Sequence, residues 1–209
     1  MAAFDFDGTL SSRDSFLRFV RLVAGPAATA TAMAKAVPAL LASRRDATQR
    51  DVAKAIVLRE TMRGRQVDHV RDLGARYARL VVTRHLNPEV VDRLEAHRAA
   101  DHELVIVSAS LTCYLEPAAE RLGIPTVLAT ELEVGPDDRY SGELAGPNVR
   151  GAEKARRLDA WLGGDAAVVY AYGDSHGDAE LLARADHPFL VDARGRIPES
   201  APWPDGARR

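Results

Sequence analysis

The chain of 209 residues is long enough for one domain with an inserted subdomain. Hydrophobic residues make up 46% of it and charged residues 28%, a balance typical of globular proteins with ample core material. A single cysteine excludes a disulfide framework and a cysteine-rich metal site, and the most apolar long stretch, 26–42, is short for a membrane span of about 20 residues. No signal peptide is visible, so a cytoplasmic location is expected.

The charge is unevenly distributed along the chain. Residues 11–86 contain 15 basic and 6 acidic residues, a net charge of +9, while the rest of the chain carries a net charge of −11. This basic segment suits an anionic substrate and would also suit an anionic membrane surface. Solvated helix faces account for most of these arginines in the simplest interpretation.

The first predicted element is a strand in the stretch from Ala3 to Leu10, where apolar residues alternate with Asp5 and Asp7 until Gly8 permits a sharp turn. Side chains two apart on a strand point to the same face, so both carboxylates begin on one side of the backbone. Such a pair at a strand end can be an ordinary acidic terminus or a site for a hard cation such as Mg²⁺. With a cation present, one carboxylate can attack phosphorus and the other can act as acid and base.

Four helices are predicted before residue 87. Their apolar residues recur at helical spacing, and glycines at 25 and 64 mark two of the helix ends. The predicted ranges are about 16–24, 27–42, 51–62 and 67–86. Together they form a small helical subdomain inserted after the first strand.

From residue 87 onward, predicted helices alternate with predicted strands. The helices cover 88–100, 114–122, 152–162 and 178–185, and the strands cover 104–107, 126–129, 167–172 and 189–191, with a hairpin at 131–134 and 140–144. This alternation predicts an α/β fold with a parallel sheet and helices on both faces. The proline-rich tail from Arg194 is expected to be loosely ordered.

Polar residues at the ends of the predicted strands are the candidate ligand-binding residues, because ligands sit beyond the carboxyl ends of parallel strands. Ser108-Ala109-Ser110 follows one strand, and alone it reads as an ordinary helix cap. Asp174 and Asp178 follow another strand and supply two further carboxylates. Lys154 lies in the first turn of a predicted helix, where a cation is unfavourable unless an anion compensates it.

In this order, Asp5 to Thr9, Ser108, Lys154 and Gly173 to Asp178 resemble the four motifs of haloacid dehalogenase superfamily hydrolases. The helical insert after the first motif looks like a C1 cap, and residues 129–134, 140–142 and 148–154 resemble subfamily IB, which includes phosphoserine phosphatase-like proteins. The resemblance implies a Rossmann-like core domain of residues 1–12 and 86–193, an all-helical cap domain of residues 13–85 and a loose tail of residues 194–209.

The resemblance also implies roles for individual residues. Asp5 would be the nucleophile that forms an aspartyl-phosphate, and Asp7 would protonate the leaving oxygen and then activate water. Mg²⁺ would be held by Asp5, the backbone carbonyl of Asp7 and Asp174, with Asp178 close by. Ser108 and Lys154 would hold the phosphoryl oxygens, and the expected substrate-binding residues are Gly8, Thr9, Asp14, Ala109 and Ser110.

The expected reaction is Mg²⁺-dependent hydrolysis of a small phosphorylated metabolite resembling phosphoserine. Asp14 stands where phosphoserine phosphatases carry a glutamate for the substrate's amino group, although it could instead cap the first cap helix. The alternatives are a lipid-phosphate phosphatase at a membrane surface and a phosphotransferase on the same scaffold. The expected partner is a small phosphate ester and not a nucleic acid, with weak membrane contact through the basic cap as one possibility, in a monomer or homodimer.

Overall fold

The computed structural model describes residues 1–164, 167–198 and 203–204. At its centre lies a five-stranded sheet in the order β3-β2-β1-β6-β7, and every pair of neighbouring strands is parallel. The strands are β1 (Ala2–Phe4), β2 (Leu104–Leu111), β3 (Thr126–Thr130), β6 (Tyr170–Gly173) and β7 (His187–Leu190). The predicted α/β fold with a parallel sheet is therefore confirmed.

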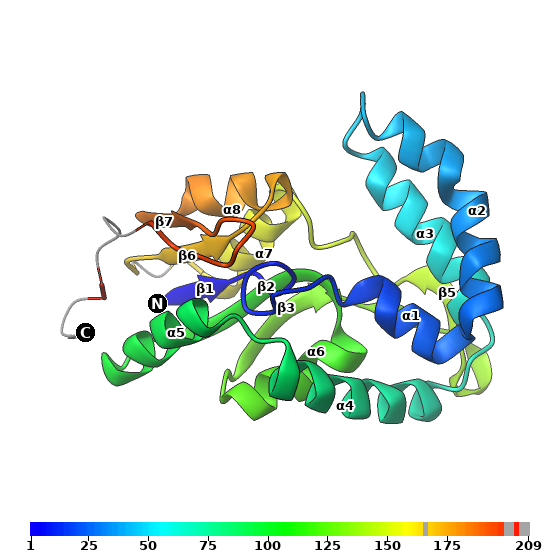
Figure 1. Cartoon of the computed structure of the whole chain (residues 1–209), viewed down its shortest axis with the longest axis horizontal. Coiled ribbons are helices and arrows are strands. Elements are labelled where there is room, and N and C mark those ends of the chain that lie inside the picture. The colour runs from blue at the N-terminus through cyan, green and yellow to red at the C-terminus, as the bar shows by residue number, and fades with distance from the viewer. Residues whose placement is uncertain (165–166, 199–202, 205–209) are drawn as a thin grey trace.

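Alternating side chains place the strands between two apolar layers. Phe4, Ile106 and Tyr172 belong to the larger core, which α5 (Pro88–Ala99) and α6 (Thr112–Leu122) cover. The intervening residues, such as Ala3 and Val105, face the smaller core under α7 (Ala152–Leu162) and α8 (Ala179–Arg184), on the other side of the sheet (Figure 1). Burial on both faces explains why the strands read as continuous apolar runs in the sequence.

Four helices lie between β1 and α5 in the chain, as the sequence predicts. They are α1 (Phe16–Ala24), α2 (Pro26–Ala42), α3 (Gln49–Met62) and α4 (Val67–Arg84), and we call residues 16–84 the helical insertion. Figure 1 shows α2 and α3 projecting side by side from one end of the sheet, while α4 runs along α6. A Cβ at Gly74 would lie 2.0 Å from the Cys113 carbonyl oxygen, so only glycine permits this close approach of α4 to α6.

The two segments that join the helical insertion to the sheet lie side by side. Ser12 N–H donates to the His85 carbonyl at 2.7 Å, and Asn87 N–H donates to the Leu10 carbonyl at 2.9 Å. A second contact comes from the predicted hairpin, β4 (Leu132–Val134) and β5 (Tyr140–Leu144), which is joined by the short helix η1 (Pro136–Asp138) and packs against α3. These contacts hold the helices over the carboxyl ends of the strands.

The described part of the tail differs from the expectation of loose order. Ile197 is buried, its N–H donates to Glu89 Oε1 at 2.8 Å, and the ring of Trp203 lies 4.0 Å from the Arg93 guanidinium carbon. The described part of the tail therefore packs on α5, a partner that no local pattern in the tail reveals. Residues 199–202 and 205–209 of this predicted tail lie outside the described residues.

Two strands start at other residues than predicted. The strand predicted at 167–172 begins at Tyr170 as β6, and the strand predicted at 189–191 begins at His187 as β7. Among the described residues, none of the helices combines the length and the apolar character that a membrane crossing requires.

Candidate active site

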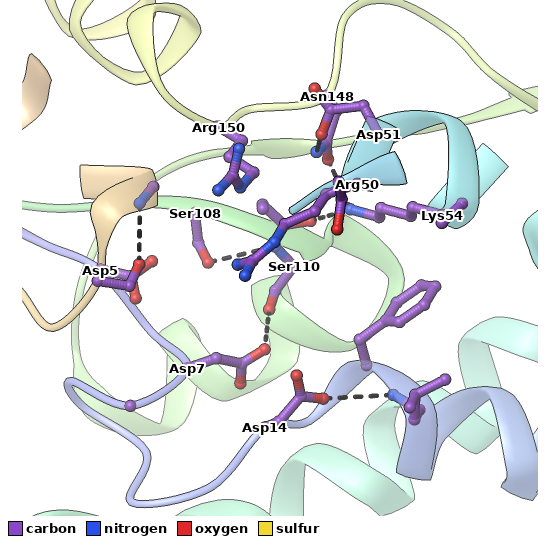
Figure 2. Close-up of a pocket in the computed structure, with 18 of the residues that line it drawn as sticks. Asp5, Asp7, Asp14, Arg50, Asp51, Lys54, Ser108, Ser110, Asn148 and Arg150 are labelled. Carbon is purple, nitrogen blue, oxygen red and sulfur yellow. Dashed lines mark hydrogen bonds between the residues drawn. The ribbon is translucent and has the colours of Figure 1, made fainter. Parts of the chain in front are cut away.

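A cavity of about 580 Å³ lies between the carboxyl ends of the strands and the helical insertion, within the size range of small-molecule sites (Figure 2). Its two sides differ in chemistry. The side nearest the sheet, which we call the floor, consists of Asp5, Asp7, Ser108, Lys154, Asp174 and Asp178. The opposite side includes an apolar roof, which we define as Phe16, Leu17, Met33, Ala36, Leu40 and Val57.

Lys154 binds two carboxylates at the floor. It lies in the first turn of α7, and its Nζ donates to Asp5 Oδ1 at 2.5 Å and also to Asp178 Oδ1. All three side chains are buried. Burial alone would lower the pKa of Lys154, but the two carboxylates outweigh it and raise that pKa, so the ammonium stays charged. The anion that the sequence predicts near Lys154 is therefore partly supplied by the protein itself.

Asp5, Asp174 and Asp178 form a carboxylate cluster in which one oxygen of each lies within 4.8 Å of the others. Burial, together with the neighbouring charges of Asp5 and Asp178, raises the pKa of Asp174 to about 6. Such crowding of carboxylates is relieved by a bound cation, and oxygen donors suit a hard ion such as Mg²⁺. These residues therefore fit the cation that the sequence predicts.

The three carboxylates are not equally free to bind a cation. Asp178 Oδ2 accepts the Ser175 N–H at 3.0 Å and the Ser175 hydroxyl at 2.8 Å, while its Oδ1 accepts from Lys154. Asp174 instead lies against Gly8, where a Cβ would come within 2.3 Å of Asp174 Oδ2. Gly8 also has φ of +84°, so both its conformation and this close approach require glycine.

The carboxyl group of Asp7 lies apart from this cluster. Its Oδ1 accepts the Ser15 N–H at 3.0 Å, and its Oδ2 accepts the hydroxyls of Ser15 at 2.9 Å and Ser110 at 2.8 Å. Burial raises the pKa of Asp7 to about 7, although these hydrogen bonds oppose the rise. Asp7 is thus held in a place and with a pKa that suit proton transfer near neutral pH. Its predicted contact with a cation, through the backbone carbonyl, stays a prediction.

The three residues of the predicted phosphate-binding segment, Ser108, Ala109 and Ser110, make different contacts. Ser108 is buried at the floor, and its Oγ accepts the Ser110 N–H at 3.2 Å. Ala109 accepts a hydrogen bond from Lys54 through its carbonyl, and Ser110 donates to Asp7 (Figure 2). All three residues line the cavity. Of the two serines, Ser110 donates its hydroxyl to Asp7, whereas the Ser108 hydroxyl makes no bond to a catalytic candidate among the described residues.

Two other predicted substrate-binding residues, Thr9 and Asp14, differ from each other in position. Thr9 does not line the cavity, and its side chain is fully buried, with no hydrogen-bond partner for Oγ1 among the described residues. The turn after Gly8 carries Thr9 back towards the core, and Thr9 N–H donates to the Phe6 carbonyl at 3.3 Å. Asp14 lines the cavity, and its Oδ1 also accepts the Leu17 N–H at 3.4 Å, so it serves the start of α1 as well.

Several cavity residues escape sequence reasoning. Lys54 on α3 is partly buried, and its Nζ donates to Asn148 Oδ1 at 2.6 Å as well as to the Ala109 carbonyl. Asn148 Nδ2 in turn donates to Asp51 Oδ1 at 2.7 Å, so hydrogen bonds join α3 to the segments that carry Ala109 and Asn148. Burial lowers the pKa of Lys54 to about 7. Ser15, which binds Asp7, lies in a polar link that offered no signal beyond helix capping.

Two arginines from different elements line the cavity. Arg50 projects from α3 and Arg150 from the segment before α7 (Figure 2). Within the described residues, neither guanidinium has a hydrogen-bond or ion-pair partner. Helical spacing shows that Arg50 and Lys54 share a face of α3, but it does not show that this face meets the floor.

Comparison with known proteins agrees with this geometry. A family model for haloacid dehalogenase-like hydrolases matches residues 2–183. Protein CicA of Caulobacter vibrioides is 36% identical over 94% of this chain and 87% of its own length. A protein described as inhibiting morphological differentiation in Streptomyces azureus is 32% identical over 91% of this chain and 71% of its own length. A probable phosphatase of Mycobacterium tuberculosis is 30% identical over 97% of this chain and 73% of its own length.

Solved structures show the same fold. A Bordetella pertussis protein of unknown function superimposes with a TM-score of 0.73 at 25% identity, covering 88% of this chain and 85% of its own. A phosphoserine phosphatase in its apo form superimposes with a TM-score of 0.62 at 13% identity, covering 91% of this chain and 84% of its own. With a family match that spans most of its length and two acidic strand ends meeting one lysine, this chain belongs to the haloacid dehalogenase-like hydrolase family.

Proposed function

We propose that the protein is a Mg²⁺-dependent phosphatase that hydrolyses a phosphate monoester through a phosphoenzyme on Asp5. The observation that carries this proposal is the buried Asp5–Lys154 pair, with Asp174 and Asp178 beside it, at the floor of a cavity of ligand size. A site that only binds phosphate has no need of a buried carboxylate next to the bound anion. The phosphatase names of two relatives and of several structural neighbours support the same class of reaction.

In the proposed reaction, Asp5 attacks phosphorus and forms an acyl phosphate, and the ester oxygen leaves with the proton of Asp7. Water then attacks the phosphorus of the acyl phosphate, Asp7 takes up the proton of that water, and inorganic phosphate and the Asp5 carboxylate are released. The raised pKa of Asp7, about 7, suits both of its proton transfers. Ser108 and Lys154 would bind the phosphoryl oxygens.

Charge neutralisation is the other requirement of phosphoryl transfer. Asp5 and Asp174 would hold Mg²⁺, with Asp178 fixing its neighbours, and the ion would supply positive charge between the carboxylates and the phosphoryl group. Arg50 and Arg150, which lack protein partners in the described residues, would add positive charge from the cavity side.

We also infer that residues 13–85 act as a cap over a core of residues 1–12 and 86–193.

The test is phosphate release from p-nitrophenyl phosphate with Mg²⁺ and with a chelator. The Asp5→Asn variant should lose activity by about 10⁴-fold, because the amide is not a nucleophile, while its circular dichroism and Tm stay those of a folded protein. Asp159→Asn, on the exposed outer part of α7, is the matched control and should keep full activity. If the Asp5→Asn variant retained activity, Asp5 would not be the nucleophile.

The identity of the ester is a separate question. A small phosphorylated metabolite such as phosphoserine, a lipid phosphate, and transfer to an acceptor other than water are all compatible with the floor. A panel of phosphoamino acids, sugar phosphates, alkyl phosphates and lipid phosphates separates the substrates. Adding an alcohol acceptor and measuring transferred against released phosphate separates transfer from hydrolysis.

A further inference from the structure

We propose that the natural substrate is the phosphate monoester of an apolar alcohol, whose hydrocarbon part lies against the apolar roof. This inference rests on the proposed phosphatase function and names the class of ester. It depends on the side of the cavity that takes no part in the chemistry.

The apolar roof is contributed by all three helices that face the floor. On α2, Met33, Ala36 and Leu40 follow each other at spacings of three and four, so they form one face that lines the cavity. Phe16 on α1 and Val57 on α3 continue this surface. A substrate extending away from the floor therefore meets hydrocarbon side chains from three helices.

Part of this surface is not covered by the protein. Leu17 and Leu40 are each 38% exposed although both line the cavity, and Phe16 and Met33 are only partly buried. Apolar area inside a cavity is stabilised when an apolar ligand displaces water from it. The uncovered leucines are the surface that an apolar alcohol would cover.

The polar groups on the same side are mostly occupied. Lys54 is bound by the Ala109 carbonyl and Asn148, and Asp51 is bound by Asn148. Asp14 accepts from a backbone N–H of α1. An alcohol rich in hydroxyl or amino groups would therefore find few unoccupied partners beyond the phosphate.

The unpaired charges also disfavour a zwitterionic alcohol. Arg50 and Arg150 are both cationic and both face the cavity, so they complement phosphoryl oxygens but repel an ammonium group. The two carboxylates that line the cavity from the roof side, Asp14 and Asp51, each already accept a hydrogen bond, and Asp14 is also exposed. An uncharged hydrocarbon chain is not repelled by the two arginines and needs no carboxylate partner.

The apolar alcohol could be part of a soluble ester or of a lipid in a bilayer, because the roof contacts only hydrocarbon in either case. The experiment therefore has two parts. In the first, kcat/KM of the wild-type protein is measured for methyl, propyl, pentyl and heptyl phosphate, with phosphoserine as the zwitterionic comparison. Burial of each added methylene should raise kcat/KM by about fourfold until the roof is covered, and phosphoserine should fall below propyl phosphate.

Two leucines that are adjacent in α2 supply the variant and its control. Leu40→Ser should flatten the rise from methyl to heptyl phosphate, because Leu40 lines the cavity. Leu41→Ser should leave the rise unchanged, because Leu41 is 58% exposed and does not line the cavity. The heptyl-to-methyl ratio within each protein is the readout, so a partly unfolded preparation does not disturb it.

The second part compares pentyl phosphate in solution with phosphatidic acid in phosphatidylcholine vesicles. Faster turnover of the vesicle lipid assigns the apolar alcohol to a membrane lipid, and faster turnover of pentyl phosphate assigns it to a soluble ester. A flat or falling chain-length series in an active wild-type protein, or equal slopes for Leu40→Ser and Leu41→Ser, would overturn the inference. Inactivity towards every ester, p-nitrophenyl phosphate included, would instead overturn the proposed function.

Discussion

The floor and the apolar roof of the cavity are built on different physical principles. At the floor, charged groups are bound by groups from distant parts of the chain, as Lys154 is by Asp5 and Asp7 is by Ser110. The roof has no such bonds, and its side chains only present hydrocarbon. Directional, charge-assisted bonds fix positions to a fraction of an ångström, whereas apolar contact tolerates changes of shape.

Under the proposed function, this difference assigns the reaction to the floor and the choice among esters to the apolar roof. Phosphoryl transfer requires charges that are placed before the substrate arrives, so a change at the floor should reduce the hydrolysis of every ester. A change at the roof should alter the ranking of esters, since it changes burial of the alcohol alone. The predictions below test that separation, beginning with the largest expected effect.

After Asp5→Asn, replacing Lys154 by Met should have the largest effect, because it leaves Asp5 and Asp178 buried without their common partner. We expect kcat to fall by about 10²- to 10³-fold and the free energy of unfolding without Mg²⁺ to fall by about 3–5 kcal/mol. Activity assays and urea denaturation measure the two effects.

The matched control is Lys35→Met, which removes an exposed lysine paired with Glu60 at 2.7 Å on the helical insertion. A surface pair contributes about 0–1 kcal/mol, so this variant should resemble the wild type. Equal losses in the two variants would contradict a special role for the floor lysine.

Gly8→Ala should disturb the floor without changing any charge. The added Cβ would lie 2.3 Å from Asp174 Oδ2, so either the backbone or Asp174 must move. We expect kcat/KM to fall by about 100-fold and the Mg²⁺ concentration for half-maximal activity to rise, as a Mg²⁺ titration of activity would show.

Gly64→Ala is the control for the backbone part of this change. Gly64 has a similar φ of +74°, but nothing lies within 4 Å of its Cβ position. It should cost about 1 kcal/mol of stability and leave activity unchanged. A Gly8→Ala protein with normal Mg²⁺ dependence would show that Asp174 does not hold the ion.

Ser15→Ala tests the link between the two regions, because Ser15 lies at the start of α1 and binds Asp7 at the floor. Losing the hydroxyl should reduce kcat for alkyl phosphates by about tenfold. The loss should be smaller for p-nitrophenyl phosphate, whose good leaving group needs less protonation. Ser12→Ala, which removes an exposed hydroxyl bonded to the His85 carbonyl, is the control. Equal losses on both substrates would mean that Ser15 has only a structural role.

Thr9→Val should have the smallest effect. The Thr9 hydroxyl is buried without a partner among the described residues, so an apolar group of the same shape should fit at least as well. We expect activity within about twofold of the wild type and a free energy of unfolding higher by about 1 kcal/mol. A large loss of activity would mean that Thr9 contributes to substrate binding after all.

Much of the fold and of the floor could be predicted from the sequence, because both depend on regular geometry. Alternating strands and helices dictate a parallel sheet, and the carboxyl ends of parallel strands meet at one edge. Asp5 and Asp174 follow adjacent strands of that sheet, and Lys154 begins the helix before the second of them, so their convergence was foreseeable.

Only the tertiary structure decided the roof and the fine placement of the polar groups. Helical spacing assigns Leu40 and Leu41 to different faces of α2, but it does not say which face meets the cavity. The bonds from Ser15 to Asp7, the turning of Thr9 into the core and the packing of Ile197 on α5 likewise depend on long-range contacts. The sequence by itself thus determined the carboxylate cluster of the candidate site, because local periodicity and strand order bring Asp5, Asp174 and Asp178 together. Which apolar surface lies opposite that site depended on how the helices pack across the cavity, and no local pattern encodes that packing.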